Sequence, residues 1–390
     1  MLMKKSILLL TNAYPDFPSS YRGIFIKRTA LQLVHEGREV YVVTPKIYRK
    51  SDCLEVQEGV RVFRFPFFAG DQLLIEYENI PYLRMIAYYM TGTLLTLYVT
   101  LRYRCKLIHA HWAIPTGLIG VVVGALLGKP LIVTTHGSDL RMAISKGPFL
   151  KRIFTYVCQK AHRLICVSEG MRQDLESMGI DMTKTTVLPM GVDESFFKIG
   201  MGGKRGLSKR DCVILSNRNL QPIYNVSQLI RAIPIVLEEH PNVKFWIAGE
   251  GREEDDLKNK VDELGVSPSV QFLGRIPHEK MPDLLGETDI YVSTSTTDGA
   301  SVSLLEAMAS GAFPVVTDIS ANREWITDGE NGFLVPTGNE AFLARKIVEA
   351  LRRPELRATA VERNRIFVEE KGALRDHVRQ LSNLYAICFG

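Results

Sequence analysis

Short apolar runs of strand length alternate with segments of helical period along most of the chain. In the first half these runs are SILLLT, EVYVVTP, VRVFRF, KLIHA, LIVTTH and RLICVS. From Asp211 the pattern restarts with CVILS, VKFWIAGEG, VQFLG, DIYVSTS, FPVV and NGFLVP, and residues 338–390 are helical in pattern throughout. Strands that alternate with helices indicate βαβ units and parallel sheets. The sequence therefore predicts an α/β fold.

The length and one break in the pattern predict two domains. A single hydrophobic core rarely grows beyond about 300 residues, and this chain has 390. Residues 191–210, GVDESFFKIGMGGKRGLSKR, are rich in Gly, Lys and Arg and carry no strand signal, so they are interpreted as a linker. We expect Rossmann-like domains over 1–190 and 211–370 and a C-terminal helix over 371–390, for which packing back on the first domain is one arrangement. Two such domains would leave a ligand-binding cleft between the carboxyl ends of their sheets.

Composition indicates a globular enzyme of the cytoplasm. The chain is 46% hydrophobic and 23% charged, and its six cysteines form no CxxC pair and no metal-ligand spacing. They are interpreted as reduced thiols of a cytosolic protein. The first ten residues, MLMKKSILLL, hold an apolar run too short for a signal peptide, and they are interpreted as leading into a first strand.

The charge is unevenly distributed along the chain. Residues 1–190 contain 24 Lys and Arg against 14 Asp and Glu, whereas the remainder contains 24 against 29. A basic first half favours an anionic partner on that side, and an anionic membrane face or a phosphate-bearing acceptor fits it. Solvated surface lysines are the plainer alternative. No zinc-finger spacing, RNP-type motif or arginine-rich tract is present in the sequence, so nucleic acid is not expected as a partner.

Residues 85–101 form an apolar segment that requires a membrane test. They carry no charge over 17 positions between Arg84 and Arg102, but they include four threonines and a glycine. A spanning helix needs about 20 apolar residues, so no transmembrane span is predicted. A buried helix of the first domain is expected, and the alternative is a helix lying at a bilayer surface, because basic residues flank its tyrosines.

Two carboxylates in the run DGASVSLLEAMASGAFPV, residues 298–315, point to a ligand site. Asp298 opens a small-residue loop and Glu306 lies eight positions further on, in the expected helix. The N-terminus of a helix carries about half a positive charge and offers N–H groups that suit phosphate. Carboxylates beside a phosphate need hydroxyl partners, and a nucleotide sugar supplies both. The alternative is an acid that merely complements the helix dipole.

The same run resembles the signature of the retaining family 4 glycosyltransferases of GT-B fold (glycosyl transferases group 1), in which two acids are separated by seven residues. Other segments resemble the family in the expected order, and together they cover nearly the whole chain. They are KKSILLLTNAYPDFPSSYRGIFI, IHAHWAIPTGL, VTTHGSDL, IAGEGREEDDL, VQFLGRIPHEKMPDLL, DIYVSTS and DGENGFLVP. The resemblance implies two Rossmann-like domains whose parallel sheets face each other across a cleft. It also implies transfer of a sugar from a nucleoside-diphosphate sugar to an acceptor hydroxyl with retention at the anomeric carbon.

The resemblance assigns donor-binding roles to the two acids and the loop between them. Glu306 would hold the ribose hydroxyls, since a carboxylate accepts two hydroxyl donors. Asp298 would lie beside the donor sugar as a catalytic residue, where the family usually has the longer glutamate. Four backbone N–H groups would meet sugar hydroxyls or the β-phosphate, those of Gly299, Ala300, Ser301 and Val302.

Further roles follow from other matching segments. Arg218, in SNRNLQPIYNVSQLI, would stabilise the leaving diphosphate, whereas the family's nearby lysine is replaced by Tyr224 or Asn225. Gly249 and Gly251 would approach the nucleotide base.

In the first domain, Gly23 opens a helix where it would let the diphosphate or the acceptor come close. His136, at the carboxyl end of a strand, would face the donor sugar as a catalytic residue. His111 and Asp139 are placed on the acceptor side. His109 and His111 flank Ala110 and so share one face of the expected strand, and His109 is expected to be a structural histidine that packs under Trp112.

Several classes of function are disfavoured by what the sequence lacks. The turn GEG at 249–251 lacks the third glycine of a dinucleotide-binding GxGxxG, which disfavours a dehydrogenase. No GxxxxGK[ST] loop is present in the sequence, which disfavours a P-loop kinase. No DxD cluster follows a strand, so neither a metal nor another cofactor is expected.

We therefore predict a hexosyltransferase-type enzyme that acts in cell-surface polysaccharide, glycolipid or lipid-linked glycan synthesis. Its expected partners are a nucleotide-sugar donor and an anionic or lipid-linked acceptor. Its expected location is the cytoplasm, with peripheral contact at the inner face of an anionic cell membrane as an option. A sugar-nucleotide epimerase and a non-catalytic nucleotide-sugar-binding subunit are the alternatives.

Overall fold

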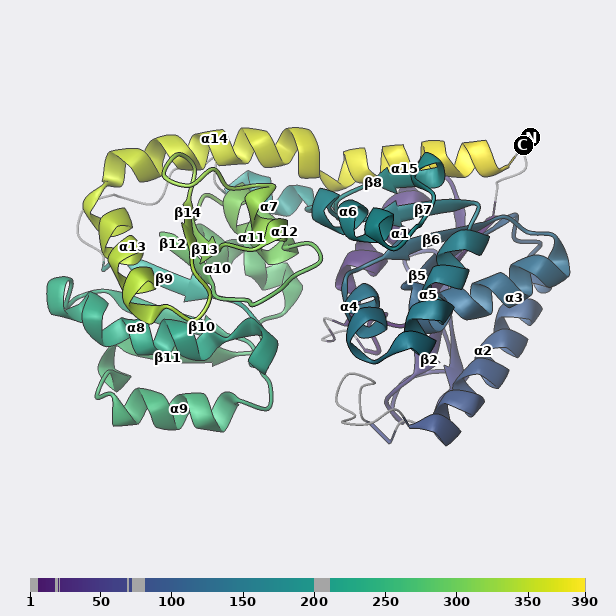
Figure 1. The fold of residues 1–390 in the computed structure, drawn as a ribbon, viewed down its shortest axis with the longest axis horizontal. Coiled ribbons are helices and arrows are strands. Elements are labelled where there is room, and N and C mark those ends of the chain that lie inside the picture. The colour runs from purple at the N-terminus through teal and green to yellow at the C-terminus, as the bar shows by residue number, and fades with distance from the viewer. Residues whose placement is uncertain are drawn as a thin grey trace. The chain divides into compact units, whose positions relative to one another are not determined.

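The chain forms two compact α/β units (Figure 1). The computed structural model describes residues 6–17, 20, 22–68, 70–71, 81–199 and 211–389. The first unit comprises Met1–Gly191 and Leu374–Gly390, and the second comprises Val192–Ala373. Each unit is built on one mainly parallel sheet with helices packed against it, which confirms the predicted pair of Rossmann-like domains.

The first unit contains an eight-stranded sheet in the order β3-β4-β2-β1-β5-β6-β7-β8. All neighbouring strands are parallel except the antiparallel pair β3 and β4. Six strands coincide with the apolar runs of the sequence, because a parallel strand buried on both faces is apolar along its whole length. The strands are β1 (Ser6–Thr11), β2 (Glu39–Lys46), β3 (Leu54–Gln57), β4 (Val60–Pro66), β5 (Leu107–His111), β6 (Leu131–Thr135), β7 (Arg163–Cys166) and β8 (Thr185–Val187).

Helices of the first unit include one from the far end of the chain, α15 (Leu374–Cys388). It buries Leu374, Val378, Leu381 and Tyr385 in the same core cluster as Ile7 and Leu9 of β1. Residues 374–388 are therefore part of the first unit's core and not an appendage. The other helices are α1 (Ile24–His35), α2 (Tyr82–Arg102), η2 (Ala113–Gly117), α3 (Leu118–Leu127), α4 (Ser138–Ser145), α5 (Pro148–Lys160), α6 (Glu169–Ser177) and η3 (Met182–Lys184).

The second unit contains a six-stranded, all-parallel sheet in the order β11-β10-β9-β12-β13-β14. Counted from its first strand this is the order 3-2-1-4-5-6 of a dinucleotide-binding Rossmann fold. Ile214 and its neighbour Leu215 lie in two different core clusters, so both faces of the sheet are buried. The strands are β9 (Val213–Ser216), β10 (Lys244–Ala248), β11 (Val270–Gly274), β12 (Ile290–Ser293), β13 (Phe313–Thr317) and β14 (Phe333–Val335).

The helices of the second unit correct one prediction. Residues 191–210 are not all linker, because α7 (Glu194–Ile199) lies within them and buries Phe196 in a core cluster of the second unit. Residues 200–210 lie outside the described part. The other helices are η5 (Pro222–Tyr224), α8 (Val226–Glu239), α9 (Glu254–Glu263), η6 (Ser267–Ser269), η7 (His278–Lys280), α10 (Met281–Gly286), α11 (Val302–Ala309), α12 (Ser320–Arg323), α13 (Glu340–Arg352) and α14 (Pro354–Gly372).

The strand order places the candidate residues at the switch point of each sheet. The order reverses between β1 and β5 in the first unit and between β9 and β12 in the second. Ligands of open α/β sheets bind outside the carboxyl ends of the strands at such points. The loop after β9 carries Arg218, and the loop after β12 carries Asp298. In the first unit, His111 is the last residue of β5, and His136 lies in the loop after β6.

The apolar segment 85–101 lies within α2. Of the helices in the part of the chain that the structure describes, none combines the length and the hydropathy that crossing a membrane requires.

Because α15 packs in the core of the first unit, truncating one of its buried side chains should lower the free energy of unfolding. Leu381 is 1% exposed in the core of the first unit, so Leu381→Ala should lower the free energy of unfolding by about 2–4 kcal/mol. Ile387 on the same helix is 61% exposed, and Ile387→Ala should change it by less than about 0.5 kcal/mol. Urea unfolding followed by circular dichroism measures both, and equal effects would contradict the packing.

Candidate functional site

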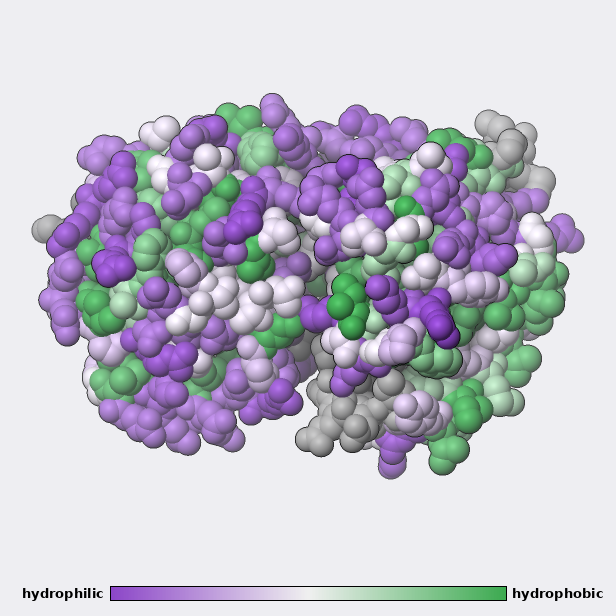
Figure 2. Space-filling view, viewed as in Figure 1, coloured by the Kyte–Doolittle hydropathy of each residue, from purple (hydrophilic) through white to green (hydrophobic). Residues whose placement is uncertain are grey.

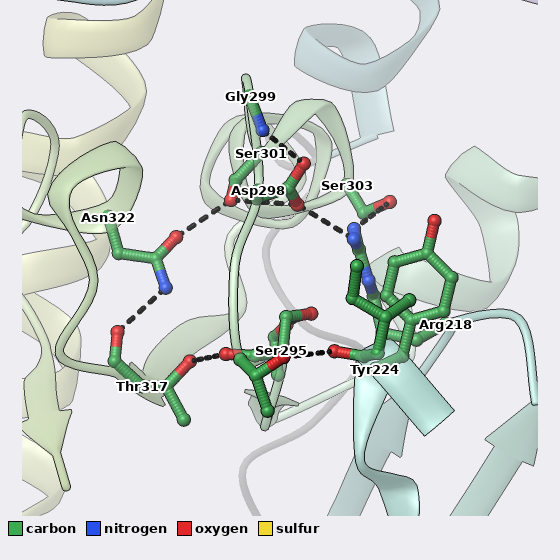
Figure 3. Close-up of polar contacts among 12 residues, drawn as sticks. Arg218, Tyr224, Ser295, Asp298, Gly299, Ser301, Ser303, Thr317 and Asn322 are labelled. Carbon is green, nitrogen blue, oxygen red and sulfur yellow. Dashed lines mark hydrogen bonds and ion pairs between the residues drawn. The ribbon is translucent and has the colours of Figure 1, made fainter. Parts of the chain in front are cut away.

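A buried ion pair joins the two loops that leave β9 and β12. The Arg218 guanidinium donates from Nη2 to Asp298 Oδ2 at 2.7 Å and from Nη1 to Ser303 Oγ at 3.2 Å (Figure 3). Its face stacks on the Tyr224 ring, with the guanidinium carbon 4.4 Å from the ring centroid. The structure thus brings together Arg218, Asp298 and Tyr224, which the sequence placed at one donor site.

Arg218 remains charged in this environment although it is only 8% exposed. Burial by itself would lower the pKa of the guanidinium, but Asp298, Tyr291 and Tyr224 together outweigh that effect and the net pKa is raised. The Arg218 Nε–H is buried and has no hydrogen-bond partner among the described residues. A buried donor without a partner is costly, so this N–H is a suitable contact for an anionic ligand oxygen.

The Asp298 loop is held by a chain of polar contacts that ends on β13. Ser301 Oγ lies 3.2 Å from Asp298 Oδ2 and 2.7 Å from Asn322 Oδ1. Asn322 in turn donates to the Thr317 backbone carbonyl at 2.8 Å (Figure 3). Asn322 is 1% exposed, so these contacts fix the loop from its buried side. Sequence analysis missed Asn322, because nothing in the run SANRE marks it as a partner of a residue 21 positions away.

Two of the four backbone N–H groups expected to meet the donor are engaged within the protein. The Gly299 N–H donates to Asp298 Oδ1 at 3.0 Å, and the Val302 N–H donates to the Ala300 carbonyl at 2.9 Å. Helix α11 begins at Val302, directly after Ser301. A ligand that used all four groups would have to displace both of these contacts.

At positions 249 and 251 the structure requires glycine, because a side chain would collide with neighbouring backbone. A Cβ at Gly249 would lie 2.4 Å from the Arg218 carbonyl oxygen, and one at Gly251 would lie 2.1 Å from that of Leu220. The Leu220 N–H also donates to the Glu250 carbonyl at 3.0 Å. The GEG turn therefore packs against the backbone that carries Arg218 and sets the position of that residue.

Tyr224 and Asn225, which replace the family's lysine, occupy different environments. Tyr224 ends η5 and covers Arg218, as described above. Asn225 has φ of 45° and precedes α8, and its side-chain amide donates to Gln228 Oε1 at 3.0 Å. Asn tolerates this left-handed conformation better than most residues. Asn225 thus acts as a turn residue, and Tyr224 is the one that contacts the site.

Glu306 has a partner that sequence analysis missed. His278 Nε2 lies 3.1 Å from Glu306 Oε1, and both side chains are largely buried. The His278 ring also packs edge-on against Phe196 of α7, with centroids 5.4 Å apart. In the sequence, His278 lies in the segment VQFLGRIPHEKMPDLL, which resembles the family, but the resemblance gives this histidine no role.

Gly23 in the first unit precedes α1 with φ of 67°, and a Cβ there would lie 2.2 Å from the Ala13 carbonyl oxygen. Its neighbour Arg22 makes a two-pronged ion pair with Asp16 at 2.7 and 2.9 Å. Gly23 thereby lets the loop after β1 fold onto the start of α1. A close approach to a ligand remains a prediction.

His111, which is buried, and His136, which is half-buried, form a hydrogen-bonded pair in the first unit. His111 Nδ1 lies 3.0 Å from His136 Nε2, and His136 is flanked by Trp112 and Phe25, with ring centroids 4.5 and 5.2 Å away. Burial lowers the pKa of His136 to about 3, with a smaller contribution from His377. Burial also lowers the pKa of His111 well below its usual value. Both rings are therefore neutral near pH 7, and one donates to the other.

Asp139 orders the loop between β6 and α4. Its carboxylate accepts from the backbone N–H groups of Ala113 at 2.8 Å and of His136 and Gly137 at 3.1 Å each. Burial raises the pKa of Asp139 to about 6, although these hydrogen bonds act in the opposite direction. Asp139 is 1% exposed, so its visible role is to hold His136 in place rather than to meet an acceptor.

His109 is structural, as expected, and its partners come from two elements. Its Nδ1 lies 2.7 Å from the Tyr385 hydroxyl of α15, and its Nε2 lies 2.7 Å from Thr134 Oγ1 of β6. Within the described residues no group of three or more His, Cys, Asp or Glu side chains could hold a metal ion. Independence from metals remains a prediction.

The buried histidines predict how stability depends on pH. Burial lowers the pKa of His109, His136 and His377 from 6.5 to about 3, 3 and 4, so below pH 6.5 the unfolded chain binds protons that the folded chain does not. Each such histidine should lower the free energy of unfolding by up to about 1.4 kcal/mol per pH unit, a slope reached only well below pH 6.5. The raised pKa of Asp139, about 6, opposes this below pH 6, but it is one group against three.

The melting temperature should therefore fall between pH 7 and pH 5, and His109→Gln should flatten that fall. His35 is exposed, so His35→Gln is the matched control and should leave the pH dependence unchanged. Circular dichroism melts at both pH values measure it. A melting temperature that rises towards pH 5 would contradict the neutral, buried state of the cluster.

Comparisons with known proteins identify the family and the fold of the chain. Two family models match the chain, "Glycosyltransferase Family 4" over residues 23–196 and "Glycosyl transferases group 1" over residues 203–367. The N-acetyl-alpha-D-glucosaminyl L-malate synthase of Bacillus anthracis is 22% identical over 386 residues, which cover 95% of this chain and 94% of that one. The phosphatidylinositol N-acetylglucosaminyltransferase GPI3 subunit of Saccharomyces cerevisiae is 25% identical over 75% of this chain, and the match spans 64% of its own length.

Solved structures of low sequence identity share the fold. The sucrose-phosphate synthase of Thermosynechococcus elongatus superposes with a TM-score of 0.82 at 17% identity, covering 98% of this chain and 99% of that one. Anabaena HepE, solved in complex with UDP, superposes with a TM-score of 0.76 at 18% identity, covering 98% and 100%. The two family models, the strand orders and these superpositions lead to one conclusion: the chain belongs to the glycosyltransferases of GT-B fold, family 4 (glycosyl transferases group 1).

Proposed function

We propose that this protein transfers a sugar from a nucleoside-diphosphate sugar to an acceptor hydroxyl, with retention at the anomeric carbon and without a metal ion. The observation that carries the proposal is the buried Arg218 at the switch point of the second sheet, with its Nε–H left without a partner among the described residues. An always-charged guanidinium with a spare donor suits a diphosphate. HepE, which shares the fold, was solved with UDP.

In the proposed reaction Arg218 stabilises charge that develops on the leaving group. As the bond between the anomeric carbon and the phosphate oxygen breaks, negative charge accumulates on the nucleoside diphosphate. The departing oxygen takes the proton of the acceptor hydroxyl on the same face, and the new glycosidic bond forms there. Arg218 is already oriented by Asp298, Ser303 and Tyr224, so little reorganisation is needed when the charge appears.

The remaining residues of the second unit would bind the donor. Glu306 would accept hydrogen bonds from the ribose hydroxyls, with His278 fixing its carboxylate at 3.1 Å. Asp298 would accept a hydrogen bond from a sugar hydroxyl while it remains paired with Arg218. Contacts from the backbone of Gly299–Val302 and from the GEG turn are part of the same proposal.

The first unit would receive the acceptor. We assign His136 to the donor sugar, and His111 and Asp139 to the positioning of His136, because they contact it directly or through its backbone. The acceptor is proposed to be anionic or lipid-linked, in polysaccharide, glycolipid or lipid-linked glycan synthesis. Names of relatives support this choice, since one is an N-acetyl-alpha-D-glucosaminyl L-malate synthase and another a phosphatidylinositol N-acetylglucosaminyltransferase subunit. We place the protein in the cytoplasm with peripheral contact at the inner face of the membrane.

The two alternatives, an epimerase and a non-catalytic binding subunit, are separated by one assay. Purified protein is incubated with UDP-, GDP- and ADP-sugars, with and without lipid acceptors. Release of nucleoside diphosphate that depends on an acceptor is the expected result. Interconversion of the donor sugar alone would indicate an epimerase, and a gain in thermal stability without turnover would indicate a binding subunit.

Replacement of Arg218 should affect catalysis far more than folding. Arg218→Ala should lower kcat by about a hundredfold or more. Arg218→Lys keeps the charge but loses the planar fork, so it should recover only part of the activity. Arg363 pairs with Glu330 at 2.8 Å on the surface, and Arg363→Ala serves as the matched control with unchanged kcat. Turnover close to that of the wild type in Arg218→Ala, with a native circular dichroism spectrum, would refute the assignment.

Replacement of His278 should weaken donor binding. Without the imidazole, Glu306 loses its orienting contact, so His278→Ala should raise the KM for the donor about three- to tenfold with a smaller change in kcat. Glu279 is the exposed neighbour, and Glu279→Ala should leave both constants unchanged. Steady-state kinetics at varied donor concentration give the answer, and an unaltered KM in His278→Ala would remove His278 from the site.

A further inference from the structure

On helix α2, several large aliphatic side chains are exposed, whereas several small or hydroxylated side chains are buried. Its buried positions are Tyr88, Gly92, Thr96, Val99 and Thr100, and both threonine hydroxyls bond to carbonyls four residues earlier at 2.7 Å. Apart from Val99, these buried positions are a tyrosine, a glycine and two threonines, whereas five Leu, Ile and Met side chains of the helix are more than half exposed. A helix packed only against its own domain normally shows the reverse arrangement.

The outward face of α2 is a continuous apolar strip. Its members recur every three or four residues and fall within an arc of about 120° at 100° per residue. They are Leu83 (84% exposed), Ile86 (56%), Met90 (62%), Leu94 (63%), Tyr98 (54%) and Leu101 (58%). The strip is about 27 Å long at 1.5 Å per residue.

Helix α3 extends this strip sideways. Exposed Val122 and Leu126 lie on α3, which packs against α2. Figure 2 shows apolar surface gathered over α2 and α3 at the right edge of the view. We call the six exposed residues of α2 together with Val122 and Leu126 the α2–α3 face. Apolar patches of this extent on a soluble domain generally mark an interaction site.

The segment that carries α2 and α3 holds only basic charges. Between Glu78 and Asp139 the sequence contains no acidic residue at all, whereas it contains Arg84, Arg102, Arg104, Lys106 and Lys129. Arg84 lies near the start of the strip, and Arg102 follows its end. An apolar strip bordered at both ends by cations, with tyrosines at Tyr82 and Tyr98, has the composition of a helix that lies in a bilayer interface. Anionic lipid headgroups would attract each nearby cation.

We propose that the α2–α3 face is the membrane-binding surface of this protein and that its partner is the surface of an anionic lipid bilayer. The helix lies parallel to the membrane, its aliphatic side chains enter the headgroup and upper acyl region, and the flanking arginines contact lipid phosphates. The inference deepens the proposed membrane contact by assigning it to particular residues. A second copy of this chain would bring two equally basic faces together, which the charges disfavour.

Flotation with vesicles tests the proposal and does not depend on turnover. Wild-type protein should bind vesicles of phosphatidylcholine with phosphatidylglycerol, bind pure phosphatidylcholine vesicles at least about tenfold more weakly, and lose binding as NaCl is raised. Ile86→Gln/Leu94→Gln removes two members of the strip and should lower the partition coefficient about tenfold or more. Ile366 and Ile387 are similarly exposed, at 50% and 61%, and Ile366→Gln/Ile387→Gln is the matched control that should bind like wild type.

Three results would overturn the proposal. Equal binding by wild-type protein and Ile86→Gln/Leu94→Gln would exclude the strip, and no binding by wild-type protein would exclude a lipid partner. Sedimentation velocity without lipid that shows a dimer, and a monomer for Ile86→Gln/Leu94→Gln, would assign the face to a second copy. Release of nucleoside diphosphate in the presence of a soluble acceptor is measured on the same samples. It should persist in the double variant, which separates failure of the membrane proposal from failure of the proposed transferase activity.

Discussion

A guanidinium that is almost fully removed from water needs a countercharge, and this constraint organises the second unit. Arg218 leaves β9 at the point where the strand order reverses, and Asp298 leaves β12 on the other side of that point. Their ion pair ties the two loops together, while Tyr224 covers the guanidinium and the GEG turn supports its backbone. A buried ion pair adds little net stability by itself. The proposed role of the cation in binding an anionic ligand accounts for the ion pair better than stability does.

The polar contacts behind Asp298 also hold a charged side chain in a fixed position. Ser301, Asn322 and Thr317 connect the loop to β13, so the carboxylate is positioned before any ligand arrives. In the first unit His111, His136 and Asp139 form a comparable arrangement, in which Asp139 accepts three backbone N–H groups and holds the ring of His136 in place. Both units therefore present side chains that are oriented by the protein, and orientation is the main contribution that such a site makes to sugar transfer.

Buried parallel strands were predictable from sequence because they are apolar along their whole length. The strands β3 and β8 were missed, since the first is a half-exposed edge strand and the second is only the three residues TTV. Helix α7 was missed because it is six residues long and lies in a Gly- and Lys-rich region. Asp298 and Glu306 were predicted from the two-acid segment, and Arg218 from the segment SNRNLQPIYNVSQLI, through the family resemblance. His278 and Asn322 were not, because each acquires its role from a partner more than twenty residues away. The glycines at 249 and 251 were noticed, but the backbone they accommodate is visible only in three dimensions.

We propose that the second unit binds a nucleoside diphosphate on Arg218 and Glu306. A crystal structure of the protein soaked separately with UDP, GDP and ADP tests it most directly. We expect a diphosphate oxygen within hydrogen-bond distance of Arg218 Nε and the ribose hydroxyls on the Glu306 carboxylate. A nucleotide bound elsewhere, with the Arg218 Nε–H still without a partner, would contradict the account.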